Sequence, residues 1–89
     1  MKSIPDHVKS YMKTALFTHD TVPAGLLKNH MTKEGAWALI RIQEGRLEYT
    51  IEESEIFILE PGHDGVIEPQ VSHHIRPLGQ VSFFIEFYK

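Results

Sequence analysis

The sequence contains no cysteine, which excludes disulfide bridges and thiolate metal sites. It also has no apolar run near the roughly 20 residues that a membrane-spanning helix needs, and its first residues lack the apolar core of a secretory signal. Positive charge is scarce, because nine lysines and arginines stand against twelve acidic residues. Such a balance disfavours nucleic-acid binding. We therefore expect a cytoplasmic protein that binds neither membranes nor nucleic acid.

Recognised catalytic signatures are absent as well. The chain has no Gly-x-Ser-x-Gly elbow and no glycine-rich phosphate loop. Ser72 and His73 are adjacent in sequence, and on a strand adjacent side chains point to opposite faces. We expect no nucleophilic catalysis and assign no catalytic residue.

The size and composition indicate one globular domain over residues 1–89. The chain has 89 residues, of which 42% are hydrophobic, so it can bury one modest core. Small cores are often supplemented by oligomerisation, and we expect a homodimer. Residues 1–13 are polar and weakly patterned. We expect them to form an N-terminal arm that makes a turn of helix or pairs with another subunit.

Short alternating segments bounded by proline and glycine predict an all-β protein. In residues 35–43 every second side chain is apolar and shares one face. Glu44-Gly45 predicts a hairpin turn with a positive φ at Gly45, after which residues 46–52 return. The other candidate strands are 14–17, 25–31, 55–59, 66–67, 73–76 and, after a Pro77-Leu78-Gly79 turn, 81–88. About eight short strands predict a small antiparallel jelly-roll barrel.

Residues 59–75 carry the strongest indication of a site. Pro61-Gly62 is followed by a short strand, a Pro69-Gln70 turn and a strand that opens with His73 and His74. Strands bent around such turns can hold one imidazole at a fixed place inside a barrel, as a metal or polar ligand requires. Alternation sends His74 to the opposite face, and we interpret His63 as a solvated turn residue.

These residues also resemble a known family. The run from Glu60 to His73 is similar to the second motif of cupins, in which a Pro-Gly turn, a strand and a proline turn precede an inward-pointing histidine. A closer resemblance is to the small cupin-like family of tellurite-resistance-related proteins, which comprises YeaR-like stand-alone proteins and the N-terminal domain of TehB-type methyltransferases. The resembling residues, within roughly 21–89, are Val22-Pro23-Ala24-Gly25, His30, Thr32-Lys33, Gly35, Trp37, Gly45, Glu68-Pro69-Gln70, His73 and Phe87-Tyr88.

The resemblance implies a small antiparallel double-stranded β-helix, the cupin-like jelly-roll barrel, and a link to tellurite or related oxyanion stress. It implies no methyltransferase activity for this chain, since the sequence ends at Lys89. The first cupin motif has a His-x-His pair and a glutamate, whereas here only His30 lies in that region and Ala38 falls near the glutamate position. We expect His30 and His73 to bind a divalent metal, either zinc, iron, nickel or manganese. The alternative is two hydrogen-bonded polar residues inside the barrel.

Four further residues are candidates for ligand binding. Trp37 and Arg41 share one face of their strand, so that Trp37 can stack on a ligand and Arg41 can hold an anion. The alternative is a packed or interfacial tryptophan beside an arginine whose stem lies on apolar surface while its charge reaches water. Glu68 can orient a histidine or contact a ligand, or it is a carboxylate at a turn. Glu86 is a lone carboxylate among aromatic residues, in the pocket or at its rim.

Three functions fit these features. The first is a stand-alone stress-response module that binds a metal, a small molecule or an oxyanion in a barrel pocket. The second is a small metal-dependent enzyme, since the cupin fold hosts both classes. The third is an interaction protein that acts through its β-sheet surface. The small set of expected ligands favours the first function.

Overall fold

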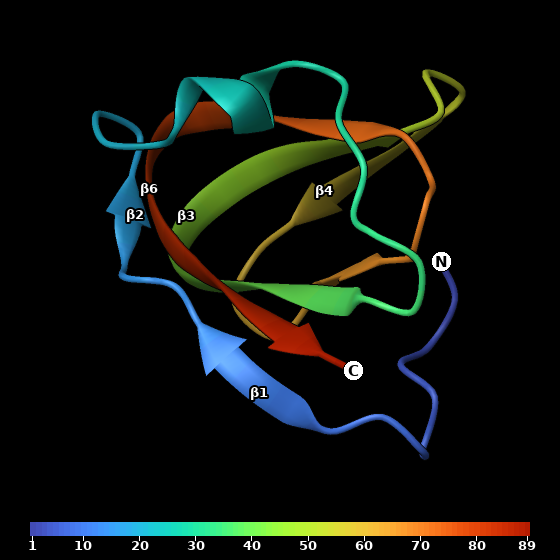
Figure 1. The fold of residues 1–89 in the computed structure, drawn as a ribbon. Coiled ribbons are helices and arrows are strands. Elements are labelled where there is room, and N and C mark those ends of the chain that lie inside the picture. The colour runs from blue at the N-terminus through green and yellow to red at the C-terminus, as the bar shows by residue number, and fades with distance from the viewer.

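The computed structural model describes residues 1–89 as an all-β protein built on one antiparallel sheet (Figure 1). Two long strands dominate the sheet, and shorter strands pair along their edges. The order is β1-β6-β3-β4, with β2 also paired to β6 and β5 to β3. No helix has the length and apolar character needed to cross a bilayer. The elements are β1 (Ser10–Lys13), β2 (Phe17–Thr18), the 3-10 helix η1 (Ala24–Leu27), β3 (Trp37–Ile51), β4 (Glu55–Leu59), β5 (Gly65–Ile67) and β6 (His73–Tyr88).

β3 and β6 pair along almost their whole length, from Trp37 opposite Tyr88 to Ile51 opposite His73. The register shifts between Ile42 and Leu47, where both strands bend. The curve of β3 and β6 around the interior is visible in Figure 1. This bend lets one continuous ribbon enclose a core instead of lying flat.

The expected hairpin at Glu44-Gly45 is therefore wrong, as is the expected turn at Pro77-Leu78-Gly79. Both segments lie inside continuous strands, so four of the expected short strands merge into β3 and β6 and the sheet has six strands. The positive φ predicted for Gly45 is present at 80°. This conformation belongs to a bulge opposite Val81 and not to a turn. The partner strand bends at the same place, and the pairing of the two strands continues beyond it.

Two expectations for the N-terminal third also need correction. The segment 25–31 was expected to be a strand, but it begins with η1 and has a single β-bridge at His30. Pro23 and Gly25 favour a turn, and the Leu26 N–H donates to the Pro23 carbonyl at 3.0 Å. The strand expected over residues 14–17 is instead the shorter β2, which begins at Phe17. In the N-terminal arm, β1 pairs with β6 of the same chain.

The alternation predicted for the strands matches the observed burial. The buried apolar side chains come from both halves of the bent ribbon. The Tyr49 hydroxyl from the second half donates to the Val66 carbonyl of β5 at 2.7 Å, which ties one wall to the other. The core lies between these walls and comprises Ala38, Ile40, Ile42, Leu47, Tyr49, Leu59, Ile67, Ile75, Val81, Phe83 and Ile85.

Candidate functional site

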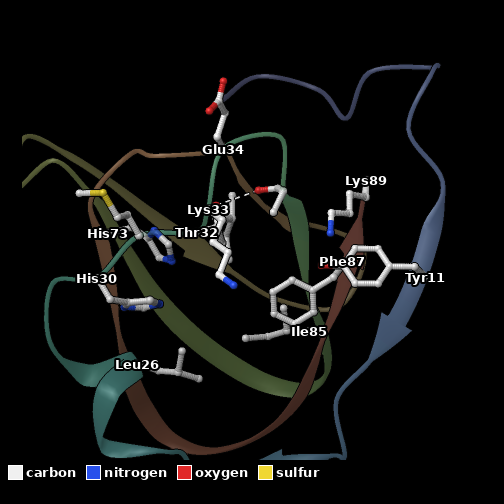
Figure 2. A pocket seen from close by; sticks show the side chains of 13 residues that line it. Tyr11, Leu26, His30, Thr32, Lys33, Glu34, His73, Ile85, Phe87 and Lys89 are labelled. Atoms are coloured by element: carbon white, nitrogen blue, oxygen red, sulfur yellow. Dashed lines mark hydrogen bonds between the residues drawn. The ribbon is translucent and has the colours of Figure 1, made fainter.

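A cavity of about 440 Å³ opens beside the core. Its volume lies within the range of small-molecule sites, and Figure 2 shows its side chains from close by. The walls come from β1, η1, the segment 30–36, β5 and β6. The lining residues are Tyr11, Leu26, His30, Met31, Thr32, Lys33, Glu34, Ala36, Ile67, His73, Ile85, Phe87 and Lys89.

The structure brings His30 and His73 together at one side of this cavity. Their backbones form an isolated antiparallel bridge, with N–H to carbonyl distances of 3.0 and 2.9 Å in the two directions. Residues opposite one another in such a bridge point their side chains to the same face. The two ring centroids are 4.1 Å apart and the rings are tilted by 58°.

Local hydrogen bonds assign the same tautomer to both imidazoles. His30 Nδ1 lies 3.0 Å from the Lys28 carbonyl, and His73 Nδ1 lies 3.0 Å from the Val71 carbonyl. A carbonyl can only accept, so each Nδ1–H donates and each Nε2 keeps its lone pair. His73 is 2% exposed, and its Nε2 is buried without a hydrogen-bond partner. Metal-ligating histidines are oriented in this way.

The surroundings favour the neutral form of His73. Burial lowers the pKa of His73 below its usual 6.5, the neighbouring imidazoles of His30 and His74 lower it further, and the Val71 carbonyl partly opposes them. Tyr49 meets the His73 ring edge-on at a centroid distance of 5.8 Å. Burial also raises the pKa of the Tyr49 phenol. A neutral imidazole with a free lone pair can bind a metal ion or accept a hydrogen bond.

The donor set fits a divalent metal only as an open site. Two imidazoles whose Nδ1 atoms are occupied by backbone carbonyls are suitable ligands for zinc, nickel or iron through Nε2. However, no group of three or more histidine, aspartate or glutamate side chains in the chain is arranged to hold a metal. His30 and His73 can therefore supply two ligands, and water or a bound small molecule would have to supply the rest.

Glu68 does not join the two histidines. Its carboxylate lies 2.8 Å from the Lys2 ammonium and lines a second cavity of about 300 Å³, next to Tyr49. The structure therefore places Glu68 at the second cavity instead of the first, and its ligand-binding role stays a prediction.

Unlike Glu68, the residues Trp37, Arg41 and Glu86 line neither of these cavities. Trp37 and Arg41 share a face, as predicted, but alternation places that face opposite the buried Ala38 and Ile40. The Arg41 guanidinium donates to Glu86 at 2.9 Å, and the Ser10 hydroxyl donates to the other Glu86 oxygen at 2.6 Å. This network fastens β1 to β6, and the hydrogen bond from Ser10, with the charges of Lys13 and Arg41, holds the pKa of Glu86 below its usual value. A ligand-binding role for the three residues stays a prediction.

The structure adds residues to the cavity that the sequence did not assign to a site. Lys33, Lys89 and Phe87 line it together with Leu26 from η1. Thr32-Lys33 and Phe87 belong to the family resemblance, which was the available signal. The sequence could not predict that these side chains converge, because their convergence depends on how the segment after His30 lies against β6.

Comparisons with known proteins agree with this architecture. The family model described as "TehB-like domain" matches residues 12–85. The Escherichia coli K12 protein YeaR, named as uncharacterized, is 23% identical over 99% of this chain and 83% of its own length. A crystal structure of an E. coli K12 protein from a structural genomics consortium has a TM-score of 0.91 at 23% identity, covering 100% of this chain and 97% of that chain. TehB from Haemophilus influenzae has a TM-score of 0.86 at 24% identity, with 93% of this chain matching 32% of that chain.

Proposed function

This chain belongs to the TehB-like domain family of tellurite-resistance-related proteins, and from that premise we propose that it is a stress-response module that binds a small ligand. The observation that carries the proposal is the cavity beside His30 and His73, with its buried, unpartnered Nε2. The chain matches about a third of the length of TehB, so the proposal concerns ligand binding by this domain only.

The bent sheet supports the finer description of the fold as a cupin-like double-stranded β-helix. In that architecture two halves of an antiparallel ribbon face each other across a core, and ligands enter at one open end. Here the core draws on both halves of β3 and β6. Both histidines lie at the edge of that core.

We further propose that His30 and His73 hold a divalent metal. The support is chemical: both Nδ1–H groups donate to backbone carbonyls, so both Nε2 lone pairs are available. A metal bound there would act as a Lewis acid toward an oxygen-containing ligand. The two histidines would orient it, and the apolar walls would limit the access of water.

Metal binding is tested by calorimetry and elemental analysis of tag-free protein with zinc, nickel, manganese and ferrous iron. We expect about one equivalent in the wild type and an affinity at least about tenfold lower in His73→Ala and in His30→Ala, because each removes one of two protein ligands. His74→Ala is the matched control, since His74 bonds to Asn29 outside the cavity. Wild-type protein that binds none of these ions, or His73→Ala protein that binds them equally well, would contradict the metal site.

One observation favours an additional role as an interaction protein that forms a homodimer. β4 is an edge strand of the sheet, and it exposes Ile56 and Ile58 at 61% and 44%. Exposed apolar edge strands are suited to pairing with a second chain.

We expect analytical ultracentrifugation to show a dimer whose dissociation constant rises at least about tenfold in Ile56→Lys. Leu27→Lys, which changes an exposed leucine outside β4, should leave the dimer intact; a wild-type monomer would refute this role.

A further inference from the structure

Two lysines border the cavity without a carboxylate partner. Lys33 and Lys89 both contribute to the lining, and no acidic group lies within 4.0 Å of either ammonium. Figure 2 shows the Lys33 ammonium reaching between the imidazoles and the Phe87 ring, while the Glu34 carboxylate points away. The lining therefore carries two lysines and one carboxylate, Glu34, with no ion pair among them, and the Lys89 ammonium also lies 5.4 Å from the centroid of the Tyr11 ring.

The backbone around Lys33 is held on several sides. The Ala36 N–H donates to the Lys33 carbonyl at 3.0 Å, and the Thr32 hydroxyl donates to the Ala36 carbonyl at 2.8 Å. The Gln70 N–H donates to the Thr32 carbonyl at 3.1 Å and attaches this turn to the segment before β6. A lysine on an anchored turn loses less freedom on binding than one on a mobile loop.

The remaining wall is apolar. Seven of the thirteen lining residues are hydrophobic. Ile85 and Phe87 lie across from the two imidazoles, and Leu26 lies near His30 (Figure 2). An inorganic oxyanion would contact the charged side and leave this wall unused. An organic anion would use both, because burying apolar surface is favourable at roughly 25 cal/mol per Å².

A buried polar atom independently indicates a bound group. His73 Nε2 has no partner in the protein, although leaving a buried polar atom unsatisfied is costly. Because its lone pair accepts, this atom would be satisfied by a metal ion or a hydrogen-bond donor, and a carboxylate would reach it through such a metal. Neither an arginine nor a helix of useful length faces the cavity, and these are the groups that proteins commonly use for phosphate. The charged side is thus better suited to a compact, singly charged group.

We infer that this cavity binds a small organic carboxylate, with its carboxylate near Lys33 and Lys89 and its apolar body against Leu26, Ile85 and Phe87. The inference rests on the proposed function, because it names the ligand class of the same cavity. A carboxylate is also a common ligand for divalent metals. A metal on His30 and His73 and the carboxylate would therefore strengthen each other's binding.

The test is a calorimetric and NMR titration of the full chain with hexanoate, 1-hexanol and inorganic phosphate, without metal and with zinc. We expect hexanoate to bind about fivefold to tenfold more tightly than hexanol, because the alcohol keeps the apolar body and removes the charge. Lys33→Gln should reduce this preference, since only Lys89 then remains, and should leave hexanol binding unchanged. Lys28→Gln, a change of an exposed lysine outside the cavity, should preserve the preference.

The outcomes separate this inference from the metal proposal. Hexanol or phosphate that binds as tightly as hexanoate would overturn it, as would a Lys33→Gln protein that keeps the full preference. Zinc binding without any hexanoate binding would also overturn it while leaving the metal site in place. Hexanoate binding with the expected preference in a protein that takes up no zinc would support it and refute the metal site alone.

Discussion

Replacing Gly45 with alanine is expected to destabilise the fold by at least about 3 kcal/mol, a large part of the margin of a small domain. Gly45 has a φ of 80°, where a side chain is strained. An added Cβ would also lie 2.1 Å from the Gln80 carbonyl oxygen and 2.9 Å from the Val81 Cα. Because both contacts are with backbone, the bend of β6 against β3 would have to open. Urea denaturation followed by circular dichroism measures the change.

Gly79→Ala is the matched control for this substitution. Gly79 has almost the same φ, 84°, but an added Cβ there meets nothing within 4 Å. It should therefore show only the cost of the backbone conformation, about 1–2 kcal/mol. If the two variants lose equal stability, the close approach of β6 to Gly45 does not hold the bend, and our account of how the ribbon closes is wrong.

Gly45 also shows how far the sequence could predict the fold. Period-two alternation predicted which side chains of β3 and β6 share a face, because alternation leaves a local signature in the sequence. The same sequence predicted hairpins at Glu44-Gly45 and at Pro77-Leu78-Gly79, and both were wrong. A glycine with positive φ serves a turn and a bulge equally well. The difference lies in whether the partner strand continues opposite it, which is a long-range property.

The candidate site was likewise predictable where the signal is local and not predictable where it depends on long-range contacts. The motif around His73 indicated an inward histidine, and the resemblance paired it with His30. The partner's local structure was not predictable, since the expected strand over 25–31 is a helix turn followed by one β-bridge. For Trp37 and Arg41 the alternation was right about a shared face. Both faces of that strand carry apolar residues, however, and only packing against β6 decides which one is buried.

The stability of the protein is expected to fall in mild acid because of His73. Burial lowers the pKa of this imidazole in the folded state, and the charges of His30 and His74 lower it further, whereas in the unfolded chain it titrates near 6.5. The unfolded state therefore binds the proton more readily, and stability that is complete above pH 6.5 is lost as the pH falls toward the folded-state pKa. The loss can reach about 1.4 kcal/mol per pH unit, or up to about 2 kcal/mol at pH 5.

Urea denaturation in the presence of a chelator, at about pH 7.5 and about pH 5, measures this dependence without any contribution from bound metal. His73→Asn removes the titrating group, so this variant should lose less stability between the two pH values even though the substitution leaves a less well filled site. His63→Asn, at an exposed turn, should lose as much as the wild type. If His73→Asn and the wild type have the same acid dependence, the His73 proton is not excluded in the folded state. Nε2 would then be accessible to water, and the burial that supports a ligand at this atom would no longer hold.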